Sequence, residues 1–73
     1  MKAAEVISAV AREMDLSPRR IVGPERWTEY MAARREVARR LREAGWSYPR
    51  IGRALRRNQA TIFGLLHPRK AAA

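Results

Sequence analysis

The 73-residue sequence contains no cysteine, one histidine and no long run of apolar residues. Without cysteine the chain can form neither disulfides nor thiolate-ligated zinc sites, the usual supports of small domains. No residue beside His67 could complete a metal site or a catalytic triad with it. We therefore expect no metal, no cofactor, no enzymatic activity and no small-molecule substrate.

The apolar stretches are too short for a membrane-spanning helix, which needs roughly 18 consecutive apolar residues. Glu5 and Arg12 interrupt the apolar start of the chain, so it does not resemble a signal peptide. These features, with the lack of cysteine, predict a cytoplasmic protein that neither spans nor binds membranes.

Large apolar side chains are also scarce. Leu, Ile, Val and Phe together number 14 of the 73 residues, just below the roughly one fifth that, with high charge, is typical of disordered chains. One small domain is the most that this length allows. A folded domain is expected only if these few residues are spaced to share a core.

Their spacing has the helical period and predicts a small all-α domain of about five helices. Ser17 and Pro18 begin a short helix that ends at Gly23, Gly45 closes the long helix, and Ser47 and Asn58 are predicted N-caps of the last two helices. The predicted helices cover residues 2–14, 18–22, 25–44, 49–55 and 59–66 or 67, and we expect the tail at 69–73 to be disordered.

Two of these helices have a predicted apolar side. On the first it carries Val6, Ile7, Val10 and Met14. On the long helix it carries Trp27, Tyr30, Met31, Val37, Ala38 and Leu41, while Arg34, Arg35, Arg39, Arg40 and Arg42 cover the rest. We expect Trp27, Tyr30 and Trp46 to lie in the core rather than to stack on unpaired bases.

The positive charge is concentrated in the second half of the chain. Residues 1–33 carry five basic and five acidic side chains, whereas residues 34–73 carry eleven basic and two acidic ones and hold the whole net charge of +9. An excess of this kind is typical of proteins that bind a polyanion. A merely solvated, arginine-rich surface is the alternative.

The last two predicted helices match the helix-turn-helix pattern, in which two helices joined by a short turn cross closely. Ile51 and Leu55 face Ile62 and Leu65, and Gly52 lies where a larger side chain would collide with the partner helix. A helical hairpin of any function could show the same apolar pattern. The outward residues favour DNA, because no acidic residue follows Glu43.

In such an arrangement the start of the second helix enters a major groove. Gln59 can pair with adenine, and the methyl groups of Ala60 and Thr61 can contact thymine. Arg57 could reach a guanine or a phosphate, and Asn58 flanks it. The expected contacts to the DNA backbone or minor groove are Arg34, Arg35, Ser47, Tyr48, Arg50, Arg53, Arg56, Arg69 and Lys70.

Residues 47–62, S-Y-P-R-I-G-R-A-L-R-R-N-Q-A-T-I, resemble the signature of the C-terminal DNA-binding domain of the bacterial replication initiator DnaA, S-x-x-x-I-G-x-x-F-G-G-R-D-H-T-T-V. The resemblance extends weakly over the rest of the chain, which is then one domain of this kind. It implies a helix-turn-helix fold of the Trp-repressor-like type. It also implies base contacts by Arg57, Asn58, Gln59, Ala60 and Thr61, and a minor-groove contact by Arg35.

The chain departs from that family in its turn and in the residues that would read bases. Arg56 replaces the Gly-Gly turn with one residue deleted, and Asn58-Gln59-Ala60 replaces Asp-His-Thr, which implies a different target sequence. The chain has no phosphate-binding loop of an ATPase. It therefore cannot melt a replication origin alone.

Two classes of function remain open. The first is a sequence-specific binder of double-stranded DNA associated with the nucleoid, either a small bacterial or phage-derived transcription regulator or the DNA-binding module of an activator. A short half-site binds weakly, so RNA polymerase or another regulator is an expected partner. The second is a helical adaptor for an acidic protein partner; a non-specific or replication-related DNA binder is a further alternative.

Overall fold

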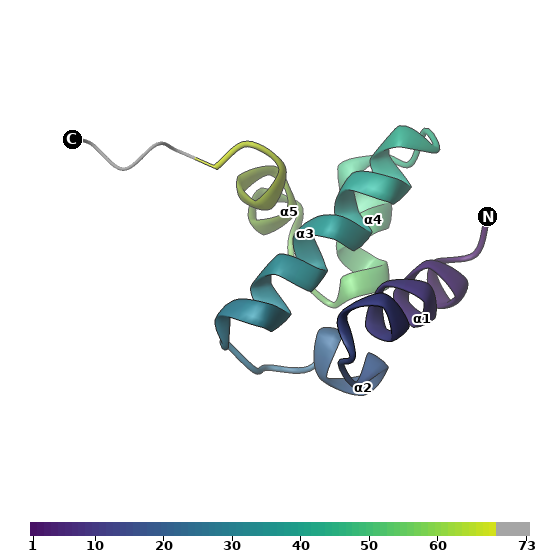
Figure 1. Ribbon diagram of the computed structural model, residues 1–73. Helices are drawn as coiled ribbons and strands as arrows, with labels where there is room; N and C mark the ends of the chain where they lie inside the picture. The colour runs from purple at the N-terminus through teal and green to yellow at the C-terminus, as the bar shows by residue number, and fades with distance from the viewer. Residues whose placement is uncertain (69–73) are drawn as a thin grey trace.

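The computed structural model describes residues 1–68, within which the chain forms five helices and no strand (Figure 1). The helices are α1 (Ala3–Met14), α2 (Pro18–Ile21), α3 (Thr28–Glu43), α4 (Tyr48–Leu55) and α5 (Gln59–Leu66). The predicted all-α class is confirmed, and every helix begins and ends within three residues of its predicted position. The expected disordered tail at 69–73 lies outside the described residues.

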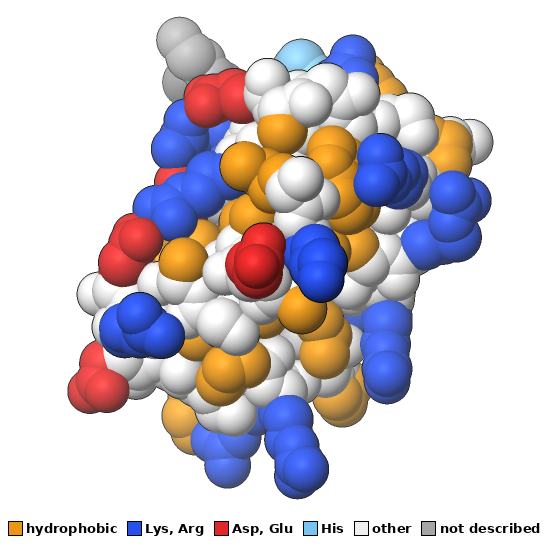
Figure 2. Space-filling model, turned by 90° about the vertical axis from the view of Figure 1, so that its right-hand side faces the viewer, with side chains coloured by type: hydrophobic (Ala, Val, Ile, Leu, Met, Phe, Trp, Pro, Cys, Tyr) orange, Lys and Arg blue, Asp and Glu red, His pale blue; other side chains and the backbone are white. Residues whose placement is uncertain are grey.

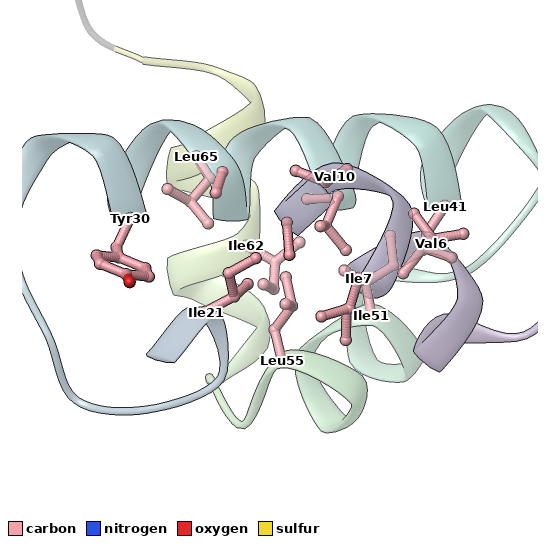
Figure 3. Packing of buried hydrophobic residues seen from close by; sticks show 14 of the residues in the cluster. Val6, Ile7, Val10, Ile21, Tyr30, Leu41, Ile51, Leu55, Ile62 and Leu65 are labelled. Atoms are coloured by element: carbon pink, nitrogen blue, oxygen red, sulfur yellow. The ribbon is translucent and has the colours of Figure 1, made fainter. Parts of the chain in front are cut away.

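Helix α3 is the central element, because it packs against each of the other four helices. Figure 3 shows side chains from all five helices meeting in one cluster. The largest fully buried apolar residues of this core are Val10, Ile21, Val37, Leu41, Ile51, Leu55 and Ile62. The few large apolar residues of the chain are thus concentrated in one place, which is how so short a sequence supports a core.

Three residues predicted for the core lie outside it. Trp27 is 62% exposed, Met31 38% and Met14 36%. Trp27 is the N-cap of α3 and has extended backbone angles, so its side chain does not follow the helical face that the sequence pattern assigned to it. The prediction is correct for Tyr30 and Trp46, which are buried.

Helices α1, α3 and α4 end in the same way. A residue with a left-handed backbone follows directly after α1 and α4 and one residue later after α3: φ is 56° at Asp15, 56° at Arg56 and 94° at Gly45. The next amide then donates to a carbonyl five residues earlier, as in Trp46 N–H to Leu41 O at 3.0 Å. Gly45 therefore closes α3 as predicted. Each of these turns changes the direction of the chain before the next helix.

No helix in the described part of the chain is long and apolar enough to cross a membrane.

Candidate nucleic-acid interface

Helices α4 and α5 each begin at a side-chain cap. The Ser47 hydroxyl accepts a hydrogen bond from the Arg50 amide at 3.3 Å, and Asn58 Oδ1 accepts one from the Thr61 amide at 2.8 Å. The N-caps predicted for these two helices are confirmed, whereas Ser17 holds the N-cap position of α2 without a side-chain cap bond. The caps fix where each eight-residue helix starts, and so they fix which side chains stand in its first exposed turn.

The connection between α4 and α5 is three residues long and passes close to Gly52. Arg56 adopts the left-handed conformation, and the Arg57 amide donates to Gly52 O at 2.8 Å. A Cβ atom built on Gly52 would lie 2.5 Å from Arg57 O, closer than such atoms approach in real structures. The predicted need for a residue without a side chain is confirmed, and the neighbour is the turn leading into α5.

The two faces of α5 separate clearly. Ile62 and Leu65 are buried against Ile51 and Leu55 of α4, as predicted. The outward face carries the exposed residues Gln59, Ala60, Thr61, Phe63 and Gly64. Helix α5 therefore presents a surface of amide, methyl, hydroxyl and aromatic groups with no charged side chain.

Phe63 is a candidate site residue that the sequence analysis missed. It is 52% exposed, although large aromatic side chains are usually buried. A signal was available in the sequence. Once Ile62 and Leu65 are placed inside, the helical period of 3.6 residues turns position 63 outward.

Arg34 is a wrong assignment, because its side chain lies inside the protein. It is 2% exposed, and its guanidinium donates to three backbone carbonyls: Ile21 O at 2.6 Å, Gly23 O at 2.9 Å and Arg20 O at 3.0 Å. Arg20 O and Ile21 O belong to the end of α2, where carbonyls need donors from outside the helix, and Gly23 O belongs to the loop that follows. Arg34 is therefore unavailable to DNA.

Burial of the Arg34 guanidinium lowers its pKa, and the nearby positive charge of Arg57 lowers it further. The carboxylate of Glu25 acts in the opposite direction. An arginine nevertheless stays protonated, because its ordinary pKa is far above any physiological pH. The three carbonyls thus face a buried positive charge.

Arg35 has a different environment, although it is the next residue along α3. It is exposed, and its Nε donates to Leu65 O of α5 at 2.9 Å. This contact places the Arg35 guanidinium beside the C-terminal half of α5. Thr61 precedes Leu65 by four residues, about 6 Å along the helix axis. Arg35 therefore lies beside the second half of α5, about one turn away from its first turn.

Arg57 lies in the turn before α5 and is half-buried. Its Nη1 donates to Leu55 O at 3.1 Å and to Arg56 O at 3.3 Å. Its Nη2 donates to Gly23 O, the carbonyl that Arg34 also uses. The guanidinium expected to meet a guanine or a phosphate is thus bonded to the backbone within the domain.

Aromatic and arginine side chains pack together around the start of α4. Arg50 lies over the Trp46 ring, with its guanidinium carbon 3.7 Å from the ring centroid, and Arg42 lies over Tyr48 at 4.5 Å. Tyr48 in turn meets Phe63 of α5 edge to face, with ring centroids 5.6 Å apart. Stacking restrains the long side chains of Arg42 and Arg50.

Three further site predictions fall on exposed residues: Ser47, Arg53 and Arg56. The first caps α4, the second stands in its last turn, and the third forms the turn that follows. The predicted contacts Arg69 and Lys70 lie outside the described residues.

Charge is distributed unevenly over the described surface. Ion pairs join Arg39 and Arg40 of α3 to neighbouring carboxylates, of which Glu13 belongs to α1. By contrast, no acidic residue occurs between Glu43 and residue 68, so the arginines of α4 and its turn have no carboxylate on their own segment. Figure 2 shows both acidic and basic side chains along its left edge, whereas the charged side chains along its right edge are all basic.

The ion pairs of α3 predict a pH dependence of stability. Arg39, with Arg40, lowers the pKa of Glu36 from its ordinary value near 4.5 to about 2. A lowered pKa means that the folded state favours the ionised form, so the contribution is present above pH ~4.5 and is lost as the pH falls toward ~2.

This dependence can be measured by urea unfolding of the wild type and of Glu36→Gln at pH 6, 4 and 2. We expect the wild type to be the more stable at pH 6, and the difference to shrink at pH 4 and to vanish near pH 2. A difference that is the same at all three pH values would contradict this assignment. Added salt should weaken the effect at pH 6, because these groups are near the surface.

A groove of about 640 Å³ runs beside the start of α5. Its lining comes from the α2–α3 loop, from α3 and from the turn before α5: Pro24, Glu25, Arg26, Met31, Arg34, Arg57 and Thr61. Arg26 is exposed, and the sequence analysis did not select it because it lies in the half of the chain with no net charge. Glu25 Oε2 is buried there without a hydrogen-bond partner.

Within the described residues no three His, Asp or Glu side chains lie close enough together to hold a metal ion. Comparison with known proteins finds no matching protein-family model, no matching curated protein and no matching solved structure.

Proposed function

We propose that α4 and α5 act as a helix-turn-helix that binds double-stranded DNA with sequence specificity. One observation carries this proposal: the exposed first turn of α5 bears hydrogen-bonding and methyl groups without charge, and the exposed arginines of α4 and its turn precede it along the chain. Uncharged groups of this kind read base edges, while flanking arginines bind phosphates. An eight-residue helix is long enough to place one such turn in a major groove.

Each exposed side chain of α5 has a role in this proposal. The amide of Gln59 pairs with an adenine, and the methyl groups of Ala60 and Thr61 contact thymine methyl groups. Phe63 lies four residues, about one turn, beyond Gln59 on the exposed face and extends the apolar contact. The side-chain NH₂ of Asn58 also remains available, since the cap uses only its oxygen.

The phosphate contacts are assigned to Arg50, Arg53 and Arg56, with the Ser47 hydroxyl beside them. All four residues are exposed and belong to α4 or its ends. Stacking on Trp46 supports this role for Arg50, because a side chain that is already ordered loses less entropy on binding. Phosphate contacts fix the register of the protein on the duplex but carry no sequence information.

The resemblance to the replication initiator supports the same use of α4 and α5. Transcription regulation is the role that we propose, either by this chain or by a larger activator that contains it. A single short helix reads few base pairs and binds them weakly, so RNA polymerase or a second DNA-binding domain is the expected partner.

The first test is selection of binding sites from a random duplex pool, followed by affinity measurements with Gln59→Ala. We expect one enriched motif at near-physiological salt. Gln59→Ala should then lose discrimination at one adenine of that motif, by about 1 to 3 kcal/mol for a bidentate contact. The same variant should bind unrelated duplexes as the wild type does.

Arg53→Ala tests a phosphate contact, and Arg12→Ala is its matched control, since both residues are exposed but Arg12 lies on α1. Loss of one phosphate contact should lower the affinity of Arg53→Ala for all duplexes and reduce the salt slope by about 1. Arg12→Ala should change neither quantity. Binding that vanishes at near-physiological salt and leaves no motif would refute the proposal and would favour a non-specific polyanion binder or an adaptor.

A further inference from the structure

Three bonds of one guanidinium connect parts of the chain that are far apart in sequence. Arg57 donates to Leu55 O and Arg56 O at the end of α4 and to Gly23 O in the α2–α3 loop, 34 residues earlier. Gly23 O also accepts a bond from Arg34. The turn that starts α5 is therefore attached to the loop by the Arg57 side chain.

We propose that Arg57 is a positioning residue, which fixes the direction of α5 by holding its first turn against Gly23 and does not itself contact DNA. This inference rests on the proposed function of α5. Helix α5 is only eight residues long, and its cap residue Asn58 is adjacent to Arg57. A small movement of this turn would displace Gln59 and Thr61 from the base edges, since a reading contact needs hydrogen-bond geometry.

The chemistry of the contact explains why arginine stands at this position. A planar guanidinium presents several N–H groups in a fixed fork, so it can bond to the ends of two segments at once, whereas an ammonium acts as a compact point charge. The positive charges of Arg34 and Arg57 repel each other where they share Gly23 O. The arrangement forms because the backbone carbonyls require donors. A guanidinium held by these bonds cannot extend to a phosphate.

The first experiment needs no DNA. Residual dipolar couplings of the backbone N–H groups give the direction of α5 relative to α3 in the wild type, Arg57→Lys and Arg53→Lys. Both substitutions keep the charge and replace a guanidinium by an ammonium, but only Arg57→Lys removes a guanidinium that is bonded to Gly23 O. We expect the α5 couplings of Arg57→Lys to depart from the wild-type arrangement, while those of Arg53→Lys fit it. Couplings of Arg57→Lys that fit the wild-type direction would overturn the proposal.

A measurement on the wild type covers the case in which Arg57→Lys does not fold. The side-chain ¹⁵N–¹H signals of Arg57 should show hindered rotation of the guanidinium in the free protein. They should keep their positions when the selected duplex is added, while those of Arg53 shift. An Arg57 signal that is freely rotating in the free protein, or that shifts with DNA as Arg53 does, would overturn the proposal.

Binding measurements separate this inference from the proposed function. If Arg57 positions α5, Arg57→Ala and Arg57→Lys should both weaken the selected site, on the order of tenfold, with the wild-type salt slope retained. If Arg57 is a phosphate contact, Arg57→Lys should keep most of the affinity and Arg57→Ala should lower the slope by about 1. A wild type that selects no motif refutes the proposed function, whereas the dipolar couplings still decide whether Arg57 orients α5.

Discussion

Arg34→Ala is expected to remove most of the stability of the domain. The substitution leaves Ile21 O without its donor, leaves Arg20 O with only the Gly23 amide and leaves Gly23 O with Arg57 alone. A buried polar group that loses its only partner costs about 1 to 3 kcal/mol, and the space vacated by the side chain adds to this. The expected total is about 3 to 5 kcal/mol, which matches the whole stability of many domains of this size.

Urea unfolding followed by circular dichroism measures this loss, and two further substitutions identify its cause. Arg34→Met restores much of the volume without any donor, so it should recover the packing part alone. Arg34→Lys keeps one charged donor group and should recover part of the hydrogen bonding. Arg53→Ala, at an exposed position, is the control and should shift the midpoint little. Unfolding of Arg34→Ala at the wild-type urea concentration would show that the carbonyls at the end of α2 do not need this residue.

The helices were predictable because their ends are marked in the sequence. Ser47 and Asn58 are caps of α4 and α5, and Gly45 supplies the left-handed residue that closes α3. Each signal is local, so it requires no knowledge of the rest of the fold. The helical period of the apolar residues then indicated which faces turn inward.

Arg34 shows what a pattern of polar and apolar residues misses. Its position fits the apolar stripe of α3, since Tyr30, Arg34, Val37 and Leu41 follow one another at intervals of four, three and four residues. The helical period places residue 34 inside, whereas its residue type indicated the surface, because arginine is almost never fully buried without partners. Those partners are the carbonyls at the end of α2, and only the tertiary structure brings them to α3.

The candidate site also contains features that the sequence could predict and features that it could not. The exposure of Gln59, Ala60 and Thr61 follows from the period of α5 and was predictable. The side-chain bonds of Arg57 were not, because Gly23 lies 34 residues away in the sequence. Charge alone predicts a similar role for every arginine, whereas the structure separates those bonded to carbonyls from those that remain exposed.

Gly52→Ala is expected to destabilise the domain and to shift the start of α5. The added methyl group would lie 2.5 Å from Arg57 O and 3.5 Å from Gln59 N, and both are backbone atoms that cannot rotate away. Forcing an extra carbon into such a contact costs about 1 to 3 kcal/mol after the backbone adjusts. This cost must exceed the gain of up to about 1 kcal/mol that alanine brings to a helix interior. Gly52→Val should be worse, because it adds two further carbon atoms at the same point.

Gly64→Ala makes the same chemical change in α5 and should have the opposite sign. Apart from its chain neighbours and the backbone of its own helix, no atom lies within 4 Å of a Cβ built on Gly64, so only the helix-forming advantage of alanine remains, roughly 1 kcal/mol of added stability. Urea unfolding of the two variants thus isolates the close approach at Gly52 from the general effect of replacing a helical glycine. If Gly52→Ala were stabilising as well, the turn before α5 could move freely, and then neither Gly52 nor Arg57 would determine how Gln59 and Thr61 are presented.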